Sequence, residues 1–117
     1  MPYYPPISAG VWQDLTLLNS WVNFGDPVAP IGCCVDSLQT VWMRGLGVGT
    51  IATDSVICVL PIEFRPAYRK VFAVVTGLLG YGDSFGRIDV SADGSVILLS
   101  GQAGFVSLDN VAFKAGS

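Results

Sequence analysis

The chain has 117 residues, the length of one domain with a modest core. Charged residues make up 13% of the sequence and hydrophobic residues 51%, whereas about 25% of an average soluble domain is charged. The net charge is −3, and the cations are spread along the sequence, which argues against nucleic-acid binding. So few charges indicate that part of the surface is buried against other chains, because obligate interfaces resemble a core cut in half.

The apolar content does not indicate a membrane protein. The longest run of low polarity, Val71 to Tyr81, contains glycines and falls short of the ~20 residues of a spanning helix. The N-terminus has neither the basic segment nor the apolar core of a signal peptide. An odd set of cysteines (Cys33, Cys34 and Cys58) argues against a disulfide framework. We expect no membrane insertion and reduced thiols packed as small hydrophobic groups.

The first ten residues and the rest of the chain differ in composition. Residues 1–10 are rich in proline and are predicted to form an extended arm. Two readings of Tyr3 and Tyr4 stay open: a frayed tail, or an arm that lies on a neighbouring chain, where tyrosine binds well. Residues 11–117 are predicted to form a single β-sandwich domain.

That domain reads as short strands separated by Gly, Pro and Asp-Gly. Strands are predicted at 17–24, 31–35, 40–48, 56–60, 70–76, 86–90 and 95–99, with one or two more between 105 and 113. Asp93-Gly94 predicts a hairpin with a primed turn, and 77–85 is predicted to be an apolar loop. Without any amphipathic helix, the pattern predicts an all-β, antiparallel sandwich of the jelly-roll kind.

A proline-bounded corner lies near the middle of the chain. Pro61 and Pro66 prevent a helix or a central strand from running through both positions. The corner carries Arg65 close to Glu63. This is either a local ion pair, of little energetic value when exposed, or a fixed point of surface contact.

The sequence does not indicate an enzyme. There is no histidine for acid–base chemistry or for a zinc site, and no nucleophile elbow or phosphate loop. The aspartates are spread singly, mostly in turns. Only Asp83 and Asp89 suggest a carboxylate pair of the glycosidase kind. We therefore expect no catalytic residue, no metal and no cofactor.

Several short motifs, taken in order, resemble a known class of phage module. They are Leu15 to Trp21, Val41 to Gly45 with Gly49-Thr50, Leu60-Pro61 with Phe64 to Pro66, Gly86 to Val90 with Asp93-Gly94, and Val106 to Phe113. Their order is similar to that of the C-terminal β-sandwich modules of tail-fibre and head-fibre-like proteins of tailed bacteriophages. The resemblance implies a homotrimer on the exterior of the virion, made in the host cytoplasm.

The resemblance departs from a fibre at the N-terminus. Fibre proteins of this type carry a long shaft, whereas ten extended residues reach only ~35 Å. We therefore expect a trimeric capsid decoration (cement) protein that stabilises the capsid exterior by binding the major capsid protein. Capsid contacts are expected at Tyr3, Tyr4 and Trp12, and near Trp21, although core packing is favoured for both Trp21 and Trp42.

The alternative is the tip of a tail fibre that binds a receptor or carbohydrate on the host surface. Its contacts would lie in loops at one end of the sandwich. The residues expected there are Tyr81, Asp83 and Arg65.

Overall fold

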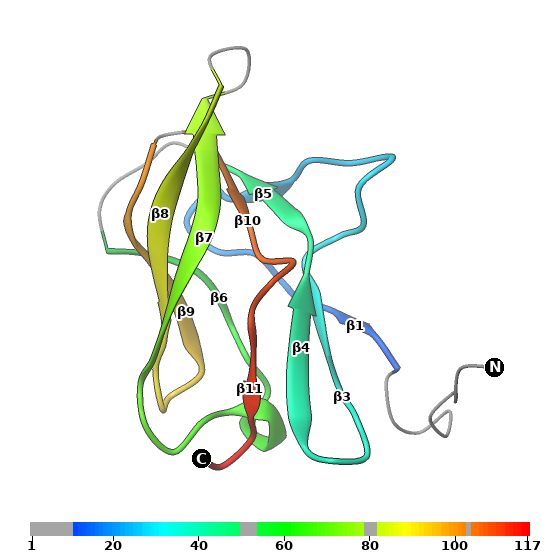
Figure 1. Ribbon diagram of the computed structural model, residues 1–117. Helices are drawn as coiled ribbons and strands as arrows, with labels where there is room; N and C mark the ends of the chain where they lie inside the picture. The colour runs from blue at the N-terminus through cyan, green and yellow to red at the C-terminus, as the bar shows by residue number, and fades with distance from the viewer. Residues whose placement is uncertain (1–10, 50–53, 79–81, 103) are drawn as a thin grey trace, which may run out of the picture.

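Two antiparallel sheets face each other and enclose one core (Figure 1). The computed structural model describes residues 11–49, 54–78, 82–102 and 104–117. The strands are β1 (Gln13–Asp14), β2 (Val22–Asn23), β3 (Gly32–Val35), β4 (Thr40–Arg44), β5 (Leu46–Val48), β6 (Ser55–Val59), β7 (Lys70–Leu78), β8 (Gly82–Val90), β9 (Ser95–Ser100), β10 (Phe105–Ser107) and β11 (Ala112–Lys114). A four-stranded sheet has the order β1-β3-β4-β11, and a seven-stranded sheet has the order β2-β5-β10-β7-β8-β9-β6. The expected all-β antiparallel sandwich is confirmed, and the predicted arm, residues 1–10, lies outside the described residues.

The chain changes sheet at Gly45. β4 belongs to the four-stranded sheet and β5 to the seven-stranded sheet, with one residue between them. Gly45 has φ +109, and a Cβ there would lie 2.6 Å from the Cα of Ile31, so only glycine fits without strain. The single strand predicted over 40–48 is therefore two strands, separated where Gly45 lets the backbone approach Ile31 closely.

Another crossover, between β10 and β11, lies beside Gly45. β10 and β11 also belong to different sheets, and the link between them packs against Gly45. The Leu108 N–H donates to the Gly45 carbonyl at 2.9 Å, and the Asp109 carboxylate accepts the Gly45 N–H at 2.8 Å. These bonds tie together two segments more than sixty residues apart, and they satisfy backbone groups that neither sheet can pair.

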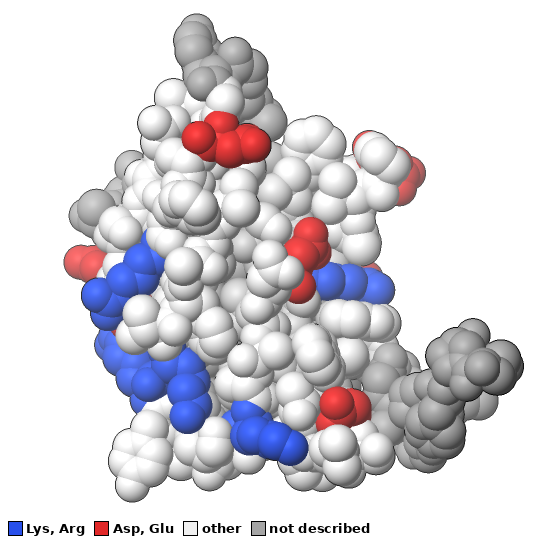
Figure 2. All heavy atoms as spheres, viewed as in Figure 1, with Lys and Arg blue, Asp and Glu red and all other residues white. Residues whose placement is uncertain are grey.

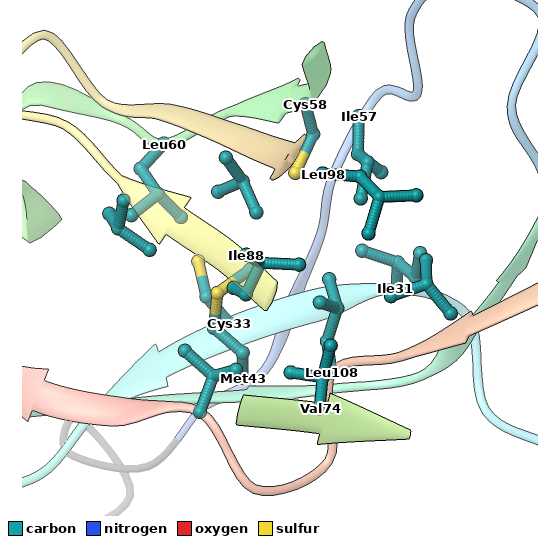
Figure 3. Packing of buried hydrophobic residues seen from close by; sticks show 14 of the residues in the cluster. Ile31, Cys33, Met43, Ile57, Cys58, Leu60, Val74, Ile88, Leu98 and Leu108 are labelled. Atoms are coloured by element: carbon teal, nitrogen blue, oxygen red, sulfur yellow. The ribbon is translucent and has the colours of Figure 1, made fainter. Parts of the chain in front are cut away.

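The core lies between the sheets and draws side chains from both (Figure 3). Cys33 and Met43 from the four-stranded sheet meet Ile88 and Leu98 from the seven-stranded sheet. Trp21 is buried too, and its indole N–H donates to the Ser55 hydroxyl at 2.9 Å. The expectation that Trp21 packs in the core is confirmed.

The predicted strand over 17–24 is wrong except at β2. Asn19 and Ser20 have positive φ values of 55° and 67°, which turns the backbone away from strand geometry. The Asn19 side chain donates to the Val56 carbonyl at 2.8 Å. These contacts hold the segment as an ordered turn. The β-propensity of its residues predicts a strand instead, because it takes no account of such contacts.

The proline corner joins two strands, β6 and β7, as expected, and it also contains a short 3₁₀ turn. β6 ends at Val59, and a short 3₁₀ turn over Ile62–Phe64 follows Pro61. Phe64 is buried, and the Arg65 side chain donates from Nε to the Leu60 carbonyl at 2.9 Å. The corner is thus held by its own side chains.

Two hairpins complete the seven-stranded sheet. β7 and β8 pair along their whole length, from Lys70 opposite Val90 to Leu78 opposite Gly82. The predicted loop over 77–85 is therefore mostly strand. The hairpin expected at Asp93-Gly94 is confirmed, but positive φ occurs at Gly94 and not at Asp93. The Gly94 N–H donates to the Ser91 carbonyl, which closes a turn of the ordinary rather than the primed kind.

Candidate functional site

The outer face of the four-stranded sheet carries a row of aromatic and charged side chains. The guanidinium carbon of Arg44 lies 4.4 Å from the ring centroid of Trp12, a cation–π contact. Arg44 also lies 3.7 Å from the Asp14 carboxylate, and its Nε is buried without a hydrogen-bond partner among the described residues. Stacking on Trp12, more than hydrogen bonding, therefore fixes the position of Arg44.

Trp42 lies next to Arg44 on the same face, two residues back along β4. Its side chain is exposed, with a relative accessibility of 45%. The indole N–H donates to the Asp36 carboxylate at 3.1 Å, and this carboxylate also accepts the backbone N–H groups of Leu38 and Thr40. The hydrogen bond from Trp42, followed by those from the backbone, lowers the pKa of Asp36. The Trp42 ring is thus held in one orientation by Asp36, and it does not pack in the core.

The strand register brings these side chains to one face. Asp14 pairs with Gly32, Gly32 with Arg44, and Cys34 with Trp42. Residues in register point to the same side of a sheet. A Cβ at Gly32 would lie 2.6 Å from the Gln13 carbonyl oxygen, so glycine is what allows β1 to approach so closely. We call the five residues of this face the platform: Trp12, Asp14, Asp36, Trp42 and Arg44.

The platform offers two kinds of interaction to a ligand. Trp12 and Trp42, with relative accessibilities of 37% and 45%, present apolar ring surface on which a flat molecule can stack. Asp14 and Arg44 offer an acceptor and a fork of donors beside those rings. An apolar surface with a few placed polar groups is typical of small-molecule recognition.

The residues expected from the sequence are only partly brought together. Trp12 belongs to the platform. Asp83 is exposed at the start of β8, on the other sheet, and Arg65 is half-buried at the proline corner. Tyr3, Tyr4 and Tyr81 lie outside the described residues.

The expected core position of Trp42 is wrong. Val41 and Met43 face the core, so their neighbours Trp42 and Arg44 face outward by the alternation of a strand. That alternation is visible in the sequence, since a charged residue shares the face of Trp42. The residue type alone favours burial of a tryptophan, whereas the alternation of the strand favours the outward position.

The suggested pairing of Asp83 with Asp89 is also contradicted. The two lie six residues apart on one continuous strand, which places them about 20 Å apart. Asp89 is fully buried and bonded to arginines, whereas Asp83 is exposed. They do not form a carboxylate pair of the glycosidase kind.

The cysteine side chains are packed and protonated. Cys33 and Cys58 have no exposed surface, and Cys34 has a relative accessibility of 4%. Burial raises the pKa of Cys33 to about 11 and that of Cys58 to about 12. All three cysteines are free thiols, as expected; burial and a raised pKa make such groups unreactive.

Within residues 11–49, 54–78, 82–102 and 104–117, no three metal-ligating side chains come together and no enclosed pocket is present. No helix in this part of the chain is long and apolar enough to cross a bilayer. The platform is an open face of the sheet.

Comparison with known proteins gives one clear structural likeness. No protein-family model matches the sequence, and no curated protein matches it significantly. The fold is similar to that of the receptor binding protein (gp15) of Listeria phage PSA, with a TM-score of 0.76 over 95% of this chain and 68% of that chain. The sequence identity is 15%, so the likeness is one of fold. This chain thus has the fold of a phage receptor-binding protein.

Proposed function

We propose that this chain is a binding module of a phage tail, located on the virion, which recognises a glycan on the surface of the host cell. The observation that carries the proposal is the platform, where two exposed tryptophans lie beside an arginine and two carboxylates. The likeness to a phage receptor-binding protein supports it. The proposal corresponds to the alternative that the sequence left open.

The chemistry of the platform suits a sugar. One face of a pyranose ring is lined by C–H groups and stacks on an aromatic ring, where it buries apolar surface. The ring hydroxyls can donate to Asp14 and accept from Arg44. Because Asp36 fixes the Trp42 indole before a ligand arrives, little side-chain entropy is lost on binding.

Capsid decoration, the first expectation from the sequence, stays a prediction, as does the homotrimer. Tyr3 and Tyr4, its expected contacts, lie outside the described residues. The copy number of the chain per virion separates the two roles. A number close to that of the major capsid protein would support decoration, and a few copies would support a tail module.

The platform is tested by binding of the fluorescently labelled chain to a panel of intact Gram-positive and Gram-negative bacteria, Listeria included. We expect at least one strain to bind, purified cell-wall polysaccharide of that strain to compete, and Trp42→Ala to weaken binding about tenfold or more. Truncation of an aromatic residue at the centre of a binding surface costs about 2 kcal/mol or more, and 1.4 kcal/mol is a factor of ten.

Phe24→Ala is the matched control. Phe24 has a relative accessibility of 43%, close to that of Trp42, and follows β2 in the other sheet. It should leave binding unchanged. Equal loss in both variants, no loss in Trp42→Ala, or no binding to any strain would contradict the proposal.

A further inference from the structure

The two tryptophans of the platform lie in one row that crosses the strands. Cys34 on β3 is opposite Trp42 on β4, and Asp14 on β1 is opposite Gly32 on β3. Continuing the register between β1 and β3 by two residues places Trp12 opposite Cys34. Neighbouring strands lie about 4.8 Å apart, so the backbone positions of Trp12 and Trp42, with one strand between them, are roughly 10 Å apart.

The strand between the two tryptophans carries little side-chain bulk on this face. The outward residues of β3 are Gly32, which has no side chain, and Cys34, which is small and has a relative accessibility of 4%. Arg44 reaches over this strand from β4, since its guanidinium stacks on the Trp12 ring. The surface between the two indoles is therefore low and is bordered by hydrogen-bond donors.

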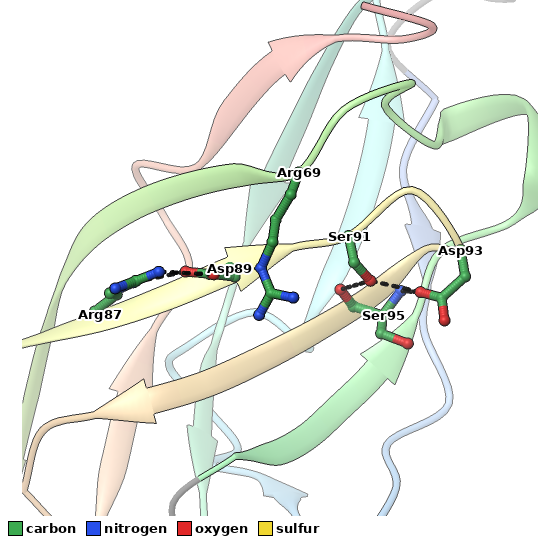
Figure 4. Close-up of polar contacts among 6 residues, drawn as sticks. All are labelled: Arg69, Arg87, Asp89, Ser91, Asp93 and Ser95. Atoms are coloured by element: carbon green, nitrogen blue, oxygen red, sulfur yellow. Dashed lines mark hydrogen bonds and ion pairs between the residues drawn. The ribbon is translucent and has the colours of Figure 1, made fainter.

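Arg44 differs from the other arginines in how it is held. Figure 2 shows most cationic side chains gathered along one lower edge of the view, near the lower ends of β7 and β8 in Figure 1. There, Arg69 and Arg87 both donate from Nε to the Asp89 carboxylate (Figure 4). Arg65 donates from Nε to a backbone carbonyl.

The guanidinium of Arg44 has weaker polar contacts. Its Nε has no hydrogen-bond partner among the described residues, and its Nη2 lies 3.7 Å from the Asp14 carboxylate, beyond hydrogen-bond distance. The side chain has an accessibility of 31%. Its exposed N–H groups therefore remain available to acceptors on a ligand.

One sugar ring cannot cover both indoles. A pyranose ring stacks on one aromatic ring and is smaller than the roughly 10 Å between the two backbone positions. A ligand that buries both indoles must contain further sugar units that bridge β3. The described residues form no enclosed pocket at either end of the row, and Ala112, opposite Trp42 on the edge strand β11, is small, so a longer chain can continue past the rings.

We propose that the platform binds a run of consecutive sugar units that lies across the strands of the four-stranded sheet, with one unit stacked on Trp42 and another on Trp12. The units between them lie over β3 and hydrogen-bond to Arg44 and Asp14. This inference rests on the proposed function, since it takes the ligand to be a glycan. It adds that the ligand is an oligosaccharide segment and not a single terminal sugar.

The test measures affinity against the length of the ligand. Oligosaccharides of increasing length are prepared from the cell-wall polysaccharide of a strain that the labelled chain binds, and isothermal titration calorimetry gives their affinities. We expect the affinity to rise at least tenfold between the component monosaccharide and an oligosaccharide that reaches both indoles, because a second aromatic anchor is then buried. Further units should add little.

Trp12→Ala and Trp42→Ala should each remove most of this gain, so that long and short oligosaccharides bind with similar affinity. Both side chains are more than one-third exposed, so the fold should survive. Phe24→Ala, on the other sheet, is the control and should keep the full gain.

The outcomes separate this inference from the proposed function. Equal affinity of the wild-type chain for the monosaccharide and for longer oligosaccharides would overturn the inference and leave glycan binding intact. A gain with length that survives both tryptophan variants would overturn it as well. Binding to no strain would contradict the proposed function, and the inference with it.

Discussion

At residue 89 a carboxylate lies on the outward side of a sheet and yet has no exposed surface. Two arginines, each with a side-chain accessibility of 50%, cover it and supply three hydrogen bonds. A buried charge that keeps its partners is tolerated, whereas breaking the set leaves donors without an ionised acceptor.

Asp89→Asn should therefore lower the free energy of unfolding by about 2 kcal/mol, the scale of hydrogen bonds to charged groups. Urea denaturation measures this change. Asp54→Asn, at an exposed position that already has positive φ, should change the free energy by less than ~0.5 kcal/mol. Similar small effects at both positions would mean that the arginines do not depend on Asp89.

Asp93 should give a pH dependence in the acid range. The Ser91 hydroxyl and the Ser95 backbone N–H hydrogen-bond to its carboxylate and hold its pKa at about 2, below the ordinary 3.8. Because the pKa is lower in the folded chain than in the unfolded chain, the stabilisation is present above about pH 4 and is lost as the pH falls toward 2. Thermal melts should show Asp93→Asn less stable than wild type at about pH 6, with the difference vanishing near pH 2. A difference independent of pH would exclude ionisation as its cause.

Among the elements, the crossovers at Gly45 and between β10 and β11, two of the four that link the sheets, carry a strong local constraint. Gly45 combines a positive φ with backbone contact to Ile31. Gly45→Ala should lower the free energy of unfolding by at least ~2 kcal/mol, because strain and a backbone clash add. Gly25→Ala is the matched control, since Gly25 has φ +95 with open space around it. Chemical denaturation of both variants separates the backbone clash at Gly45 from the φ strain that both positions share. An equal decrease in the free energy of unfolding would show that the structure around Gly45 shifts to remove the clash.

Strands with strong β-propensity and clear punctuation could be predicted from the sequence. β3, β6 and β9 lie close to their predicted bounds, and the sandwich follows from that pattern. The turn at Asn19 and Ser20 could not, because a long-range bond to Val56 selects it. The sheet change at Gly45 could not be predicted either, because it depends on Ile31 and Asp109, which the fold alone brings close.

The candidate site was only half visible in the sequence. Trp12 was expected to make contacts, but its partner Arg44 pairs with it through space, across the β1–β3–β4 register. The outward position of Trp42 could be predicted from strand alternation, although its residue type favours the core. The long β7–β8 hairpin was missed because its glycines read as loop residues, although Gly77 serves to let the Phe105 ring lie against the strand.

At the scale of the whole molecule, the paired crossovers should make the two sheets unfold together. The bonds among Gly45, Leu108 and Asp109 belong to neither sheet alone. In native-state hydrogen exchange, amides of β4 and β7 should report one common opening free energy, and Gly45→Ala should lower both by the same amount. Separate opening of the four-stranded sheet would contradict this coupling.

The buried thiols have a practical consequence for kinetics. Cys33 and Cys58 are inaccessible, and burial raises the pKa of each, so a thiol reagent added to the folded chain must wait for the chain to open. At high reagent concentration the labelling rate becomes the unfolding rate. Labelling of the native cysteines therefore measures the unfolding rate without any added probe. A cysteine introduced on the exposed surface would be labelled much faster, because it reacts without unfolding.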